Sequence, residues 1–131
     1  MNAPASETIG VIGAGAWGTA LAQMLASDGR SVRLWAFEPE LVETINAQHH
    51  NPLYLPDAEL NPNIQATNDL GDLTELDIVL GVTPAQVLGR ILADLPAAPR
   101  DLVLCSKGIE AGTGQLMNDV AKQACPHSQV A

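Results

Sequence analysis

The chain has 131 residues, of which 47% are hydrophobic, and its 15 acidic residues against 6 Lys and Arg give a net charge of −9. Its length suits a single domain, and the acidic balance argues against nucleic acid as a partner, because neutralising a phosphate backbone requires clustered cations. The apolar runs are too short for an integral membrane helix and the first residues lack signal-peptide character, so we expect a cytoplasmic protein.

The first predicted unit is a strand that runs directly into a glycine-rich turn and a helix. Residues 8–12 form a short apolar strand, Gly13-x-Gly15-x-x-Gly18 follows, and a helix is expected over residues 16–27. Gly13 permits a tight turn, Gly15 lacks a Cβ where the backbone would approach a pyrophosphate, and Gly18 lets the helix pack closely. The amino end of the helix suits an anion. The pattern predicts dinucleotide binding, with a glycine-rich structural turn as the alternative.

The rest of the chain alternates strands and helices. Further strands are predicted over residues 31–37, 64–67, 77–82 and 102–105, and a sixth begins near Gln129. Helices are predicted over residues 39–48, 85–95 and 115–125, helical turns within 69–75, and loops over 49–62 and 106–114. This alternation indicates an α/β fold with a Rossmann-type doubly wound parallel sheet in three αβα layers. We assign residues 8–131 to this domain and residues 1–7 to a disordered N-terminal tail.

The cysteines and histidines do not indicate a metal site. Cys105 and Cys125 form no Cys-x-x-Cys pair, and the histidines lack a second cluster of ligands. We therefore expect no bound metal, and we expect Cys105 to be a reduced residue of the core.

Several segments resemble, in order, those of the NAD(P)-dependent glycerol-3-phosphate dehydrogenases. They are the glycine loop and helix at 13–22, Leu-Trp-Ala-Phe-Glu at 34–38, Asn-Pro-Leu-Tyr-Leu-Pro at 51–56, Val-Thr-Pro-Ala-Gln at 82–86 and Ser-Lys-Gly-Ile-Glu at 106–110. The resemblance spans residues 8–131. It implies an NAD-binding Rossmann domain, with NADP possible as cofactor, that precedes an all-helical catalytic domain absent from this chain.

The activity that this resemblance implies is hydride transfer between dihydroxyacetone phosphate and sn-glycerol 3-phosphate, which feeds glycerophospholipid synthesis. The family places its catalytic lysine in the helical domain, so we expect no catalytic residue here and no turnover by this chain alone. We also expect the full-length protein to be a homodimer.

The glycine motif and the resemblance together predict a set of site residues. The cofactor-binding residues are Gly13, Ala14, Gly15, Ala16, Trp17, Gly18, Phe37, Glu38, Pro84 and Lys107, and Lys107 is also expected to bind substrate. Three alternatives stay open: Trp17 as a packing residue, Lys107 as a solvated loop lysine, and Tyr54 as the anchor of a surface loop rather than part of the site.

Glu38 bears on the choice between NAD and NADP. A carboxylate at the end of the second strand accepts hydrogen bonds from the adenosine ribose and repels a 2′-phosphate. Many bacterial members of the family place Arg or His at the position of Phe37, whereas Phe-Glu resembles the NAD-dependent eukaryotic branch. We predict a preference for NAD. The alternative is that Glu38 only caps the helix that starts at Pro39, where an acidic residue near the amino end is favourable.

Two other functions stay open. One is the cofactor domain of a 3-hydroxyacyl-CoA or 6-phosphogluconate type dehydrogenase, which the Lys-Gly pair at 107–108 disfavours. The other is a non-enzymatic Rossmann module that senses a nucleotide.

Overall fold

The computed structural model of the chain describes residues 8–73, 76–83, 85–96, 99, 101–105 and 129–130. The strands are β1 (Thr8–Ile12), β2 (Ser31–Trp35), β3 (Ile64–Thr67), β4 (Ile78–Gly81), β5 (Asp101–Leu104) and β6 (Gln129–Val130). The helices are α1 (Ala16–Ser27), α2 (Pro39–Gln48) and α3 (Ala85–Ala93), with a 3₁₀ turn η2 (Leu70–Leu73).

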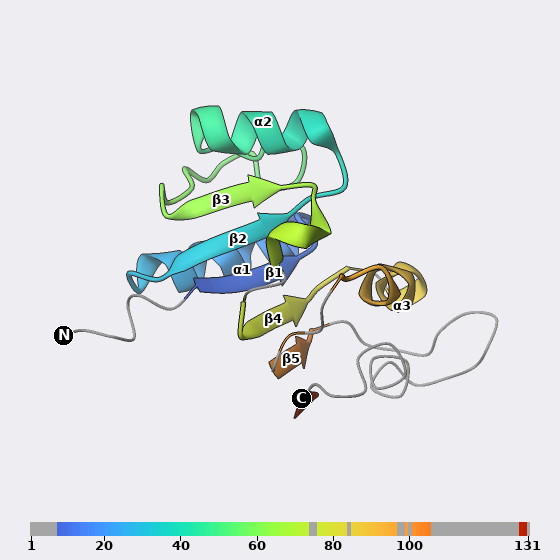
Figure 1. Ribbon diagram of the computed structural model, residues 1–131. Coiled ribbons are helices and arrows are strands. Elements are labelled where there is room, and N and C mark those ends of the chain that lie inside the picture. Colours follow the sequence, from blue (N-terminus) through green and yellow to red (C-terminus); the bar gives the residue numbers. More distant parts are fainter. Residues whose placement is uncertain are drawn as a thin grey trace.

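The described strands form one six-stranded parallel sheet in the order β3-β2-β1-β4-β5-β6. The chain builds outward from β1 to β3, then returns to the other side of β1 and builds toward β6. Figure 1 shows this arrangement, with α2 along β3 and α3 beyond the carboxyl end of β4. The predicted doubly wound sheet is therefore confirmed.

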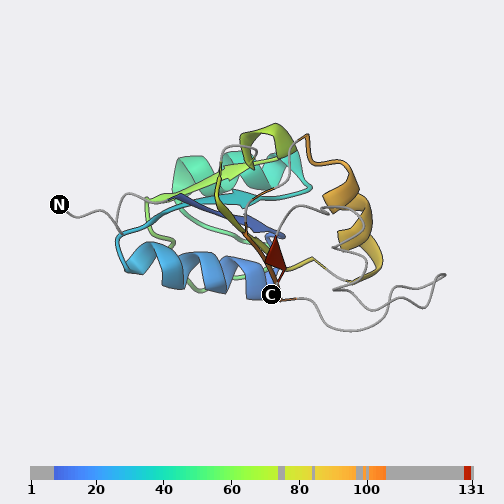
Figure 2. The ribbon, with the colours of Figure 1, turned by 60° about the horizontal axis from the view of Figure 1, so that its bottom comes forward.

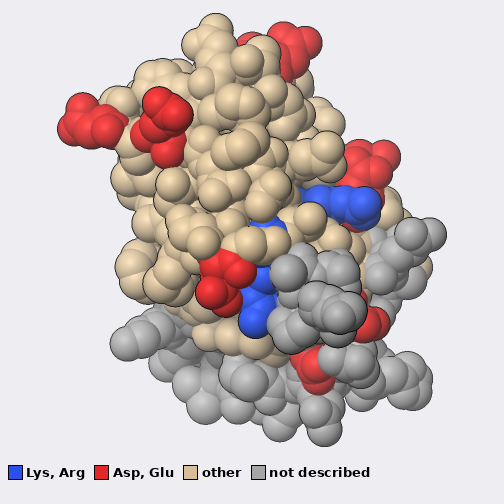
Figure 3. All heavy atoms as spheres, turned by 90° about the vertical axis from the view of Figure 1, so that its left-hand side faces the viewer, with Lys and Arg blue, Asp and Glu red and all other residues tan. Residues whose placement is uncertain are grey.

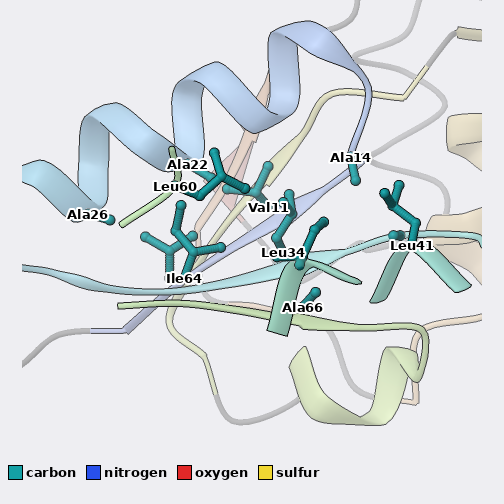
Figure 4. Packing of buried hydrophobic residues seen from close by; sticks show 12 residues of the cluster. Val11, Ala14, Ala22, Ala26, Leu34, Leu41, Leu60, Ile64 and Ala66 are labelled. Carbon is teal, nitrogen blue, oxygen red and sulfur yellow. The ribbon is translucent and has the colours of Figure 1, made fainter. Parts of the chain in front are cut away.

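Apolar side chains pack on both faces of the sheet. Successive residues of a strand point to opposite faces, so the neighbours Val11 and Ile12 belong to different clusters. The Val11 cluster joins the sheet to α1 and α2, and Figure 4 shows Ala22 and Ala26 of α1 facing Val11, Leu34 and Ile64 of the strands. The Ile12 cluster joins the sheet to Leu73 of η2 and Leu92 of α3. Figure 2 shows α1 and η2 on opposite sides of the sheet, which gives the predicted three layers.

Small residues allow α1 to lie close to the sheet. Gly18, Ala22 and Ala26 recur every fourth position, which places them on one face of the helix, and all three are buried. Larger side chains on this face would hold the helix away from the glycine turn that it follows.

Some predicted boundaries differ from the structure. The strand predicted over residues 31–37 ends at Trp35, because the chain turns away after Ala36 donates its last sheet hydrogen bond to Thr67 O at 2.8 Å. The helix predicted over residues 85–95 ends at Ala93. Cys105, expected in the core, lies just after β5 and is half-buried with a free thiol. The tail at 1–7 and the predictions for residues 106–125 lie outside the described residues.

The described surface is acidic in several separate places. Figure 3 views the face at the amino ends of the strands, where acidic side chains are scattered and basic ones are few. Within the described residues, no group of three or more His, Cys, Asp and Glu side chains could hold a metal ion. None of the helices in this part of the chain combines the length and apolarity needed to cross a lipid bilayer.

Candidate functional site

A cleft of about 520 Å³ lies at the carboxyl ends of β1, β2 and β4. Its walls come from the glycine turn, the end of β2, the loop after α2, the end of β4 and α3. The cleft spans the boundary between β1 and β4, where the order of the sheet reverses. Open α/β sheets bind ligands at such a point, because the connections on its two sides diverge and leave a crevice.

Gly13 begins the turn at the bottom of this cleft. Its φ of +118° lies in a region that residues with a side chain rarely adopt. A Cβ at Gly13 would also lie 3.0 Å from the amide nitrogen of Thr83, at the end of β4. The turn stays close to the sheet through a hydrogen bond of 3.0 Å from Gly13 N to Trp35 O. The fold therefore requires glycine at this position.

Gly18 is also required by contacts within the protein. A Cβ added there would lie only 1.8 Å from the carbonyl oxygen of Gly13, far inside van der Waals contact. The close approach predicted for this glycine is thus an approach of α1 to the carbonyl of the turn itself.

For Gly15 the described residues offer no such explanation. It is the N-cap of α1 with a φ of −70°, which any residue can adopt, and an added Cβ would meet no heavy atom of the described residues within 4 Å. Gly15 lines the cleft, no side chain caps the helix, and the first turn of α1 holds no acidic residue. An amino end of this kind offers N–H groups to an anion.

Phe37 and Glu38 form the wall beyond β2. The Phe37 ring is 79% exposed and meets Trp35 edge to face, with ring centroids 6.2 Å apart. Glu38 occupies the N-cap position of α2, but its side chain makes no capping hydrogen bond. Its Oε2 instead accepts a hydrogen bond of 2.8 Å from the hydroxyl of Tyr54. The carboxylate therefore bonds the loop after α2 and does not cap the helix by a hydrogen bond.

Tyr54 lines the cleft, so the loop after α2 forms part of the cleft wall. It lines the cleft together with Glu38. The hydrogen bond to Glu38 and the negative charge of that carboxylate raise the pKa of the Tyr54 hydroxyl above its usual value, since both favour the protonated phenol.

A fully buried amide joins this loop to the glycine turn. The side chain of Asn51 donates hydrogen bonds to Ala14 O at 3.0 Å and to Thr19 Oγ1 at 2.9 Å. Thr19 Oγ1 donates in turn to Ala14 O at 3.2 Å, and Asn51 Oδ1 accepts from Tyr54 N at 3.1 Å. Sequence reasoning did not identify Asn51 or Thr19 as part of the site.

The opposite wall comes from one face of α3. Val87, Arg90 and Ile91 line the cleft at spacings of three and four residues, which share a helix face. Arg90 was also missed from the sequence. Its helical spacing from Val87, close to the predicted turn at residues 82–86, is the signal that would have indicated it.

The remaining predicted site residues divide into three groups. Ala14 lines the cleft, whereas Ala16 and Trp17 do not. Trp17 is 62% exposed, so it is not a core packing residue. Pro84 and Lys107 lie outside the described residues, and their roles stay predictions.

Comparison with known proteins gives a consistent match over this domain. The family described as NAD-dependent glycerol-3-phosphate dehydrogenase N-terminus matches residues 8–131. The glycerol-3-phosphate dehydrogenase (NAD(P)+) of Erythrobacter litoralis is 61% identical over 123 residues, which cover 94% of this chain and 37% of that protein.

Solved structures agree with this match. The glycerol-3-phosphate dehydrogenase of Coxiella burnetii has a TM-score of 0.84 at 31% identity, over 97% of this chain and 39% of that one. The enzyme of the same name from Saccharomyces cerevisiae has a TM-score of 0.84 at 31% identity, over 96% of this chain and 41% of that one. The chain thus spans little more than a third of the length of such relatives.

Proposed function

Because the chain belongs to the family of NAD-dependent glycerol-3-phosphate dehydrogenase N-terminal domains, we propose that its cleft binds a nicotinamide adenine dinucleotide. The observation that carries this proposal is the open space at Gly15, where none of the described residues requires a glycine. A cofactor backbone that passes close to this position provides the missing reason.

The residues around the cleft fit the parts of such a cofactor. The turn from Gly13 to Gly15 and the amino end of α1 would hold the pyrophosphate through backbone N–H groups, which matters in a chain with a net charge of −9. Glu38 would accept hydrogen bonds from the adenosine ribose, and Phe37 would lie against the adenine. A carboxylate at this position favours NAD over NADP, although NADP remains an accepted cofactor in our proposal.

For the full-length protein we propose the interconversion of dihydroxyacetone phosphate and sn-glycerol 3-phosphate, which supplies glycerophospholipid synthesis. The nicotinamide supplies or accepts the hydride when bound, and the protein orients it and stabilises charge. Lys107 would contact both cofactor and substrate as a point charge. The catalytic lysine would belong to a following helical domain, and the full-length protein would be a homodimer. Nucleic acid is not part of this proposal.

The experiment is a calorimetric titration of the chain with NADH and with NADPH, followed by addition of dihydroxyacetone phosphate. We expect tighter binding of NADH and no oxidation of it by this domain alone. Absence of binding at millimolar NADH would refute the proposed cofactor site. Turnover by the full-length protein would separate the dehydrogenase from a nucleotide-sensing module, which would bind without reaction.

A further inference from the structure

We propose that Tyr54 is a positioning residue that holds the Glu38 carboxylate toward the adenosine ribose and so strengthens the preference for NAD over NADP. The inference rests on the proposed cofactor site. It starts from the hydrogen bond of 2.8 Å that the Tyr54 hydroxyl donates to Glu38 Oε2. Both side chains line the same cleft as the glycine turn.

Asn51 fixes the backbone that carries Tyr54. Its side chain is 0% exposed and bonds both the carbonyl of Ala14 and the hydroxyl of Thr19. The oxygen of the same amide accepts the backbone N–H of Tyr54 at 3.1 Å, and Leu55 N donates to Asn51 O at 3.0 Å. Buried hydrogen bonds of this kind are costly to leave unmade, so Tyr54 is held relative to the glycine turn.

A second set of contacts holds the far end of the same loop. Gln23 of α1 donates to Glu59 O at 3.2 Å and accepts from Asn61 N at 2.7 Å. Between them Leu60 is 2% exposed in the core, and its N–H donates to His49 O at 2.8 Å. The loop is therefore attached to α1 at two places, and the ring of Tyr54 reaches the cleft from a fixed base.

The hydrogen bond leaves Glu38 prepared for a ribose. Tyr54 occupies Oε2, whereas Oε1 has no hydrogen-bond partner among the described residues and can accept from a ribose hydroxyl. Without Tyr54, a half-exposed glutamate would sample several rotamers.

The direction of the carboxylate matters because a cation lines the same cleft. Arg90 of α3 lies in the opposite wall, and no ion pair joins it to Glu38 within the described residues. Arg90 attracts a 2′-phosphate that enters this cleft, so the repulsion of that phosphate depends on a carboxylate held beside the ribose. Tyr54 therefore acts on specificity through Glu38, without any need to contact the cofactor itself.

The test compares NADH and NADPH dissociation constants of the unaltered chain, Tyr54→Phe, Glu38→Gln and the double variant. We expect Tyr54→Phe, which keeps the ring, to weaken NADH binding by about 2- to 5-fold. We expect a smaller effect on NADPH, so the ratio of the two constants moves toward NADPH. Glu38→Gln should remove most of the preference, and Tyr54→Phe should then add little. Leu53→Ala is the matched control, because Leu53 is 62% exposed in the same loop and does not line the cleft.

A spectroscopic measurement reads the contact itself. Tyr54 is the single tyrosine of the chain, so ultraviolet absorbance against pH follows its ionisation alone. Glu38 raises the pKa of this hydroxyl, so we expect Glu38→Gln to lower it toward the usual value. An unchanged titration in Glu38→Gln would overturn the inference.

The binding measurements distinguish failure of the proposed cofactor site from failure of the proposed role of Tyr54. If the unaltered chain fails to bind NADH, the proposed function is refuted and the inference falls with it. If the unaltered chain binds NADH but Tyr54→Phe leaves both constants and their ratio unchanged, the inference alone is refuted.

Discussion

Substitution of Gly15 or Gly18 by alanine tests whether each glycine is required by the fold or by a ligand. At Gly18 the new Cβ would lie 1.8 Å from the carbonyl oxygen of Gly13 and 3.0 Å from its carbon. At Gly15 the new Cβ would meet no heavy atom within 4 Å in the part of the chain that the structure describes. We therefore expect Gly18→Ala to affect stability and Gly15→Ala to affect cofactor binding.

The magnitudes follow from these distances. Gly18→Ala forces the turn and α1 apart, which costs about 1–3 kcal/mol as overpacking. The better helix propensity of alanine offsets up to about 1 kcal/mol of that cost. At Gly15 the φ of −70° suits alanine. A weaker N-cap, by about 1 kcal/mol, is largely balanced there by the lower entropy of the unfolded chain.

Thermal unfolding and calorimetric titration with NADH measure the two effects on the same samples. We expect Gly18→Ala to lower the melting temperature by several degrees, at roughly 4 °C per kcal/mol for a chain of this size. We expect Gly15→Ala to melt close to the unaltered chain but to bind NADH at least about tenfold more weakly, equal to about 1.4 kcal/mol. Unchanged NADH affinity in Gly15→Ala would refute the argument that a ligand explains this glycine.

Three further predictions test the packing and the buried groups. Leu34→Ala should lower the free energy of unfolding by about 2–5 kcal/mol, because Leu34 is 0% exposed. Leu53→Ala, at an exposed position, should change it by less than about 0.5 kcal/mol, and chemical denaturation measures both variants. Asn51→Ala should lower the free energy of unfolding by about 1–3 kcal/mol and weaken NADH binding, because Ala14 O loses a buried donor. Equal stability of Asn51→Ala and of Asn68→Ala, at an exposed position, would contradict this. Burial raises the pKa of the Cys105 thiol, so less thiolate forms at neutral pH, and its alkylation, followed by peptide mass spectrometry, should rise at higher pH than that of glutathione.

Local patterns in the sequence were enough to predict the architecture. The alternation of apolar runs with helical segments predicted the parallel sheet, and α2 was predicted over the residues where it occurs, beginning at Pro39. The glycine spacing predicted the turn between β1 and α1, because the backbone of that turn depends on residues close together in the chain. The end of β2 was predicted two residues too late, because its last hydrogen bond depends on Thr67 of another strand.

The walls of the cleft were decided by tertiary structure. Asn51 bonds Ala14 across 37 positions of the chain, and Tyr54 bonds Glu38 across 16. Arg90 reaches the cleft only because α3 packs on the face of the sheet opposite to α1. No spacing rule joins such residues, because hydrogen bonds between distant segments form only after the hydrophobic faces of the elements have packed and brought those segments together. The sequence by itself therefore determined the sheet and the glycine turn, whereas tertiary packing decided which side chains line the cleft.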